Sequence, residues 1–292
     1  MIHENKDDFL NVLKQTSAQT GFTLSLIEKD YYLTLVLSRL QDLSSNLIFK
    51  GGTCLNKVYY SYYRLSEDLD FSMRLPDGKV TKTVRSRSMK PIKEKIGEFA
   101  AQFGMKLDTT KNPGRNESKQ YVFDLAYPSV VLPQEAKIRF EVGLRFNPVC
   151  PVEKHEVQHQ FTHPFTGERL FDGGEVNCLG LKELVSEKLR AAALRKTIAP
   201  RDFYDLDFIL RKKFDLTDRE VLELFRKKLA EDGGDADITR YRVNLGRRPE
   251  EIKDMSGRIK EELFEVLTAE ERKNFDLDTA IARLNQAFSK LA

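Results

Sequence analysis

The pattern of hydrophobic and polar positions changes along the chain, from mixed helices and strands to helices alone. Up to about residue 43, apolar side chains recur at three- and four-residue steps, which predicts broadly buried helix. A short strand is predicted at 46–50, followed at once by a glycine pair and a helix over 53–63. A second strand is predicted at 69–73. The first part of the chain therefore combines both kinds of element.

The central part of the chain is predicted to form a helix and three further strands. The helix is expected at 91–103, and the strands at 105–108, 120–126 and 137–146. The last strand alternates clearly. Its apolar residues face one way and its charged residues the other, as in a strand with one buried face. The apolar set is Ile138, Phe140, Val142 and Leu144, and the charged set is Arg139, Glu141 and Arg145.

From about residue 179 onward the pattern is mostly helical. We predict helix N-caps at Thr217 and at Thr268, where Glu271 three residues later would complete a capping box. The fold class expected is α+β: a mixed-sheet core with an N-terminal helix over 1–175, then a helical domain over 176–292. The active site is expected in a cleft between the two.

Composition agrees with a soluble globular protein that has a hydrophobic core. Of 292 residues, 40% are hydrophobic and 32% are charged. This hydrophobic content is higher than that of a disordered chain. No secretory signal opens the chain, and no run approaches the roughly 20 apolar residues of a membrane span. We therefore expect a cytoplasmic protein with no membrane partner. The cysteines match no zinc spacing and are expected to be reduced thiols: Cys54, Cys150 and Cys178.

Net charge is only +3, but basic residues gather between Lys79 and Lys95, where Glu94 is the single acid. Such a run either contacts phosphates or forms the solvated face of a loop and helix, and the sequence leaves both open. Its members are Lys79, Lys82, Arg85, Arg87, Lys90, Lys93 and Lys95.

The strongest chemical signal joins the glycine pair Gly51-Gly52 to Asp68 and Asp70. Two glycines between a strand and a helix let backbone approach a ligand, and a helix N-terminus offers N–H groups to phosphate. Asp68 and Asp70 stand two apart on a predicted strand, so both carboxylates point to one face. Side-by-side carboxylates suit a hard cation such as Mg²⁺.

Each half of this signal has an ordinary structural explanation. A lone glycine pair is usually a turn, and a lone Asp-x-Asp usually lies in a solvated loop. Asp70, however, stands between Leu69 and Phe71, where an unpaired charge would be costly. The two halves together indicate an active site.

The chain resembles the AbiEii/AbiGii toxin family of nucleotidyltransferases, which includes the tRNA-modifying MenT toxins. The resemblance rests on Gly-Gly-Thr-x-Leu at 51–55 and Arg-x-Ser-x-Asp-x-Asp-Phe at 64–71. It extends to three further segments, Ile27–Tyr32, Glu183–Ala191 and Arg201–Leu206. The resemblance implies a polymerase-β-like core with a mixed sheet, and transfer of NMP from an NTP.

The resemblance also assigns residues in the later motifs. Lys188 matches the catalytic lysine of the family and Asp202 its downstream aspartate, although Asp205, on the same helix face, is an alternative. A single lysine beside an apolar stripe more often snorkels to solvent. Arg190 and Arg195 are nearby candidates for phosphate contacts.

The expected site is completed by residues of the first half. Gly51, Gly52 and Thr53 are predicted to contact phosphate, with Lys57 offsetting its charge. Asp68 and Asp70 are predicted to hold Mg²⁺, with Mn²⁺ as an alternative. Glu141 is a candidate third ligand, although a surface acid between two arginines explains it equally well. One carboxylate would take the proton of the acceptor hydroxyl, and the sequence does not choose which.

The functional hypothesis is NMP transfer from an NTP to tRNA, by the toxin of a toxin–antitoxin or abortive-infection system with a cognate antitoxin. Two alternatives stay open: transfer to a protein or small molecule, and a nucleotide-binding regulator without turnover. A rival motif, His155-Glu-Val-Gln-His159, matches the zinc protease pattern. Prolines on both sides and the lack of a helical apolar stripe favour an edge strand there instead.

Overall fold

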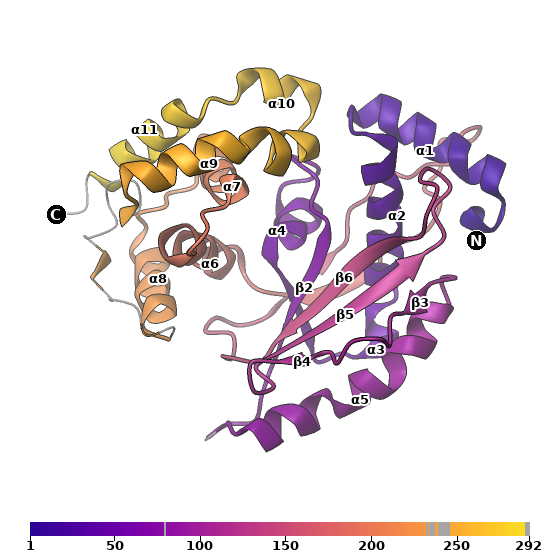
Figure 1. Cartoon of the computed structure of the whole chain (residues 1–292), viewed down its shortest axis with the longest axis horizontal. Helices are drawn as coiled ribbons and strands as arrows, with labels where there is room; N and C mark the ends of the chain where they lie inside the picture. The colour runs from indigo at the N-terminus through magenta and orange to yellow at the C-terminus, as the bar shows by residue number, and fades with distance from the viewer. Residues whose placement is uncertain (79, 232, 234–236, 239–245, 290–292) are drawn as a thin grey trace. The chain divides into compact units, whose positions relative to one another are not determined.

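The computed structural model describes residues 1–78, 80–231, 233, 237–238 and 246–289 (Figure 1). The chain forms two compact units, Met1–Leu179 and Gly180–Ala292. Among the described residues, no helix combines the length and apolarity that crossing a bilayer requires.

The first unit opens with a helical segment that is interrupted by a left-handed residue. Helix α1 (Lys6–Thr20) is capped by the Asn5 side chain and ends at Gly21, whose φ is +76°. Glycine adopts this conformation without the steric cost of a Cβ atom. Helices α2 (Leu24–Ser38) and α3 (Leu40–Leu43) follow, and most of α2 is buried.

The strands of the described residues form one mixed sheet in the order β3-β5-β6-β2-β1-β8-β7, with β4 paired to β5. The mixed sheet confirms the fold class expected from the sequence. The strand bounds are β1 Leu47–Lys50, β2 Asp68–Met73, β3 Lys106–Leu107, β4 Gly114–Arg115, β5 Gln120–Tyr127, β6 Ala136–Gly143, β7 Glu153–Glu156 and β8 Glu175–Cys178.

Strand alternation gives the sheet one apolar and one polar face at its centre. Phe71 of β2 and Phe140 of β6 are fully buried, with ring centroids 4.6 Å apart. Tyr32 of α2 stacks on Tyr127 of β5 on this same face, so α2 covers it. The opposite face carries the charged positions, and the predicted alternation of β6 is confirmed.

The basic segment forms a longer helix than the sequence predicts. Helix α5 (Lys82–Ala101) begins nine residues before the expected start at Pro91, and the Thr81 side chain caps it. Pro91 lies inside the helix, where the ring removes one backbone N–H donor. Proline is common in the first turn of a helix, and for this reason the sequence pattern placed the start of the helix at Pro91. Burial of Met89 and Ile92 on either side of Pro91 holds the helix to the core.

The helix predicted over 53–63 is also displaced. It begins at Gly51 with α4 (Gly51–Cys54) and continues as the π-helix η2 (Leu55–Tyr59). Ser61 and Tyr62 have φ values of 34° and 60°. A right-handed helix requires negative φ, so the helix cannot continue through these residues. The last predicted turn is therefore a left-handed loop leading to β2.

The second unit is helical, as expected. Its helices are α6 Leu181–Leu194, α7 Pro200–Arg211, α8 Arg219–Glu231, α9 Pro249–Glu262, α10 Ala269–Asn274 and α11 Leu277–Phe288. The predicted N-cap at Thr268 is confirmed, because its hydroxyl accepts a hydrogen bond from Glu271 N at 3.2 Å.

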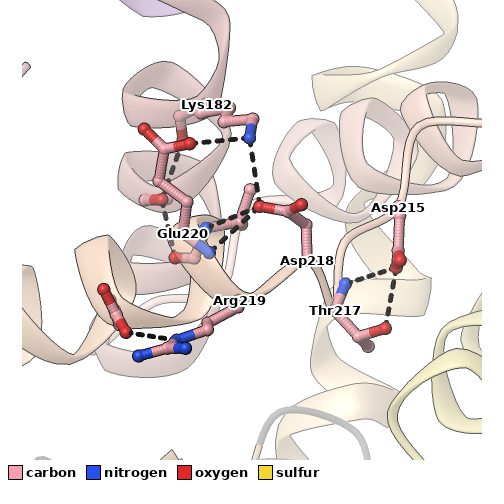
Figure 2. Close-up of polar contacts among 9 residues, drawn as sticks. Lys182, Asp215, Thr217, Asp218, Arg219 and Glu220 are labelled. Atoms are coloured by element: carbon pink, nitrogen blue, oxygen red, sulfur yellow. Dashed lines mark hydrogen bonds and ion pairs between the residues drawn. The ribbon is translucent and has the colours of Figure 1, made fainter.

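The predicted N-cap at Thr217 is wrong by one residue. Asp218 Oδ1 accepts from the backbone N–H groups of Glu220 (3.0 Å) and Val221 (3.3 Å) at the start of α8 (Figure 2). The Thr217 hydroxyl instead donates to Asp215 Oδ1 at 2.7 Å. Asp218 is favoured as the N-cap because its carboxylate also forms an ion pair with Lys182 of α6 at 3.2 Å, and a threonine hydroxyl cannot form one.

Candidate active site

At the glycine pair the backbone at the start of α4 lies close to side chains of β2 and of the segment that precedes β2. Gly51 has φ +79°, and a Cβ atom there would lie only 2.5 Å from Asp70 Oδ2. A Cβ atom on Gly52 would lie 2.7 Å from a terminal nitrogen of Arg64 and 3.0 Å from Ser66 Oγ. At both positions a side chain could be accommodated only if these neighbouring groups shifted. Each glycine therefore allows the turn to approach the motif that follows it in sequence.

A hydrogen bond ties the same turn to β2. The Thr53 hydroxyl donates to the backbone carbonyl of Asp68. Strands β1 and β2 also pair antiparallel, with Lys50 opposite Asp70. The Thr53 side chain thus holds the turn against β2. The predicted phosphate-binding segment therefore lies directly beside the predicted metal ligands.

Three of the predicted carboxylates share the polar face of the sheet. Asp68 and Asp70 are both half-buried and stand two apart on β2. Strand β6 runs parallel to β2 with Glu141 in register with Asp70, and paired residues point to the same face. Parallel pairing, invisible in sequence, brings Glu141 beside the pair.

Glu141 already has protein partners. Gln120 of β5 donates to its Oε1 at 2.5 Å, and Arg139 lies 3.3 Å from its Oε2. Within the described ranges, no three His, Cys, Asp or Glu side chains are grouped so that they could hold a metal. The residues at hand therefore offer two acidic ligands, Asp68 and Asp70, with Glu141 one strand away.

Lys57 lies in the core and not on the polar face. Its side chain is fully buried and pairs with Asp30 of α2 at 2.7 Å, while donating to Thr34 at 2.8 Å and Tyr62 at 3.3 Å. Burial lowers the pKa of Lys57, and the Asp30 carboxylate opposes that effect. Because its ammonium is enclosed by these partners, we remove Lys57 from the proposed phosphate-binding set.

The later motif gathers its charges on two helices of the second unit. Lys188 of α6 lies 3.0 Å from Asp202 and 2.7 Å from Asp205, both buried on α7. Arg195, half-exposed after α6, lies 3.2 Å from the other oxygen of Asp202. The structure brings together the two aspartates between which the sequence does not decide, and both contact the lysine.

Arg190, the remaining candidate, is half-buried on α6 near a second group of charges. In this group Lys228 of α8 lies 2.6 Å from Glu183 and 3.3 Å from Glu187. Burial is the leading influence on the pKa of Glu231 and raises it, and the Lys228 and Arg190 charges oppose that rise. Arg190 is thus set among acids that join α6 to α8.

Sequence reasoning missed several buried charges that shape these sites. Arg64 is 2% exposed and donates to the carbonyl of Leu65, and Glu28 accepts from Ser129 and from the backbone of Val130. Asp30, the partner of Lys57, is also buried. A signal was present, since a charge at an apolar position of a helix or strand needs a partner. For Glu28 and Asp30 the partners lie far away in sequence, so the local pattern did not identify them.

The rival zinc motif is excluded by its backbone. Residues 153–156 form the strand β7, so His155 and His159 do not share a helix face. His155 contacts Glu153 at 2.8 Å, whereas His159 is buried and bonds the carbonyl of Phe171 at 2.8 Å. Burial lowers the pKa of His159.

The fold is that of nucleotidyltransferase toxins. MenT4, a nucleotidyltransferase toxin from Mycobacterium tuberculosis, aligns over 96% of this chain and 90% of its own, with a TM-score of 0.60 and 19% identity. JHP933 from Helicobacter pylori aligns over 92% of both chains, with a TM-score of 0.52 and 15% identity. A comparison with curated protein sequences finds no match.

The chain belongs to the AbiEii family, nucleotidyltransferase toxins of type IV toxin–antitoxin systems, whose family model matches residues 35–285. The matched range contains the glycine turn, β2 and the Lys188 motif. The resemblance noted in the sequence is thereby confirmed.

Proposed function

We propose that this transferase moves NMP from an NTP to a hydroxyl of tRNA: the hydroxyl oxygen bonds to the α-phosphorus, and the bond to pyrophosphate, which leaves, is broken. The observation that carries the proposal is the placement of Asp70 directly over the Gly51 backbone, with Asp68 on the same face of β2. Backbone that is free of side chains beside two acidic oxygens suits a triphosphate with its cation.

Asp68 and Asp70 would hold Mg²⁺, or Mn²⁺ in its place. Mg²⁺ sites commonly use one or two carboxylates and complete the coordination with water and substrate phosphates, so the two ligands on β2 fit. When bound, the ion would offset charge on the phosphates during transfer. Glu141 stays a candidate that would have to exchange its contacts with Gln120 and Arg139 for the ion.

The chain's own groups would bind and orient the substrates. Backbone N–H groups of Gly51, Gly52 and Thr53 would contact the triphosphate. Resemblance to the family motif supports Lys188, with Arg190 and Arg195, as further phosphate contacts, and Asp202 or Asp205 would orient Lys188. A carboxylate of the site would accept the proton of the attacking hydroxyl.

Exposed cations on α5 support an RNA acceptor. Arg87, Lys90, Lys93 and Lys95 are exposed, whereas Arg85 is buried and donates to the carbonyls of Val80 and Glu117. Arg85 therefore leaves the proposed RNA surface, and Lys79 lies outside the described residues. Membership of a type IV toxin–antitoxin family supports a cognate antitoxin as partner.

The test incubates the protein with each of four α-³²P-labelled NTPs, Mg²⁺ and total tRNA, and compares wild type with Asp70→Asn. Asp77→Asn, in an exposed turn, is the matched control. We expect label on tRNA with wild type and control, and a loss of at least about 100-fold with Asp70→Asn.

Other results would redirect the proposal. Label on protein or on a small molecule would replace tRNA as the acceptor. Equal labelling by Asp70→Asn would remove this aspartate from the chemistry. A folded protein that binds NTP and labels nothing would favour a regulator.

A further inference from the structure

A cavity lies at the edge of the sheet, beside the basic helix. It measures about 180 Å³ and opens between β5 and the segment that joins β3 to β4. Its lining combines an apolar floor with charged walls. The floor is Leu107, Pro113, Val122 and Phe123, and the walls are Lys93, Asp108, Thr109, Lys111, Arg115 and Asp124.

The wall of the cavity carries more basic side chains than its acidic side chains can neutralise. Lys111 pairs with Asp124 at 3.3 Å, and Asp108 pairs with Lys137 at 3.0 Å from outside the cavity. Each of the two aspartates therefore already forms an ion pair with a lysine. Lys93 and Arg115 make no ion pair in the part of the chain that the structure describes, and both are exposed. The cavity mouth thus presents two cations that are available to an anion.

The basic helix leads to this mouth. Arg87, Lys90 and Lys93 recur every three residues along α5, so they follow one side of the helix. In Figure 1, α5 runs along the sheet edge that carries β3 and β4. Lys93 belongs both to this row and to the cavity wall, and its ammonium lies 5.8 Å from the ring centroid of Tyr121. A phosphate backbone following the row would arrive at the cavity.

The cavity also lies near the proposed catalytic aspartates. Asp124 of β5 is in register with Arg139 of β6, and Arg139 is in register with Asp68 of β2. Two strand spacings separate Asp124 from Asp68, roughly 10 Å, on one face of the sheet. A single RNA molecule that passes over this edge of the sheet would therefore span the distance from the cavity wall at Asp124 to Asp68.

We propose that this cavity binds one unpaired base of the acceptor RNA, with the flanking phosphates on Lys93 and Arg115. The inference rests on the proposed function and adds to it a recognition site. The volume lies below the roughly 300 Å³ at which pockets for larger ligands begin. An apolar floor with polar groups at its rim suits the face and edge of a base. A base paired in a duplex cannot enter, so the cavity selects single-stranded or looped RNA.

The experiment measures binding of the 292-residue chain carrying Asp70→Asn, without NTP, to fluorescent RNA. The probes are a 12-nucleotide single strand and a 16-base-pair duplex. Thr109→Trp fills the cavity from an exposed loop position, and Thr83→Trp places the same ring on α5 outside it. We expect Thr109→Trp to weaken single-strand binding about tenfold and to leave duplex binding unchanged. Thr83→Trp should change neither.

Two further measurements identify the residues that bind RNA. Lys93→Glu with Arg115→Glu should lower the slope of log affinity against log salt by about 0.7 for each phosphate that the protein no longer neutralises. Lys253→Glu with Lys260→Glu, exposed on α9, makes the same change in net charge and should leave the slope unchanged. A 4-thiouridine in the single strand should crosslink to peptides from residues 107–124.

The cavity proposal is overturned if Thr109→Trp leaves the binding of both RNAs as it is in the Asp70→Asn parent, or weakens the binding of both equally. It is also overturned if an acidic peptide competes with RNA in the Asp70→Asn parent but not when Thr109→Trp is added, because the cavity would then belong to a protein partner. These results differ from failure of the proposed function. In that case labelling of tRNA would be absent, whatever the cavity variants bind.

Discussion

At the scale of the residue, the candidate active-site motif is explained by close packing, because neighbouring groups would have to shift if either glycine carried a side chain. The Gly-Gly pair and the Arg-x-Ser-x-Asp-x-Asp segment fit together, with Gly51 under Asp70 and Gly52 under Arg64 and Ser66. In the sequence each half alone has an ordinary structural explanation, and only the two together indicate a site. Their mutual dependence follows from the antiparallel pairing of β1 with β2.

Gly51→Ala should lower activity on the order of 100-fold by displacing Asp70. The methyl group would have to displace the carboxylate, and a misplacement of about 1 Å in a catalytic group costs on the order of 100-fold in rate. Gly167→Ala is the control, because Gly167 also has a positive φ (+72°) but faces open space. Both variants should be destabilised by about 1 kcal/mol through backbone strain. The measurement is tRNA labelling beside thermal unfolding, and equal activity of the two variants would contradict the steric argument.

Lys57→Met should destabilise the protein strongly. Removing one member of a buried ion pair leaves the other charge uncompensated, which costs about 3–5 kcal/mol. The control is Lys29→Met, which breaks the more exposed pair with Glu67, for which about 1 kcal/mol or less is expected. Urea unfolding measures both. Similar destabilisation by the two variants would show that the Lys57–Asp30 pair does not fix α2 to η2.

At the scale of the element, local pattern predicted the existence of helices and strands better than their ends. Helix α5 passes through Pro91 because residues on both sides of it are buried, and α8 is capped by Asp218 because Lys182 of a neighbouring helix pairs with it. In both cases a tertiary contact overrides the local signal. Strand β2 and the N-cap at Thr268, where local and tertiary preferences agree, were predicted correctly.

Asp218→Ala should lower the unfolding temperature by roughly 2–4 °C at pH 7, because it removes the cap of α8. Thr217→Ala, the control, should have a smaller effect. The hydrogen bond from Lys182 holds the pKa of Asp218 below its usual value. A carboxyl with a lowered pKa stabilises the fold above the ordinary pKa near 4, and this contribution is lost as pH falls through the folded-state value.

The difference between wild type and Asp218→Ala should therefore be constant from pH 7 to about pH 5 and shrink below about pH 4. Thermal scans across this range measure it. A difference that grows as pH falls would show that the charge of Asp218 is not what stabilises α8.

At the scale of the whole molecule, charge distribution matters more than the small net charge of +3. Arg87→Glu with Lys90→Glu should weaken tRNA binding and reduce its salt dependence, by roughly 0.7–0.9 in slope for each phosphate left without a protein cation. Lys253→Glu with Lys260→Glu changes net charge equally on another surface. Titrations at several salt concentrations compare them. Equal effects would indicate a dependence on net charge and not on α5.

The sequence alone determined the division into a mixed first half and a helical second half, the two-faced central strands and the association of a glycine turn with Asp68 and Asp70, but not the strands β4 and β8. These features follow from periodicity and from spacings of a few residues, which are local properties of the chain. Tertiary structure decided the rest. Only strand register places Glu141 beside Asp70, and only helix packing buries Lys57 against Asp30 and joins Lys188 to both Asp202 and Asp205. The partner that satisfies a buried charge comes from a distant segment, and local spacing carries no information about which segment that is.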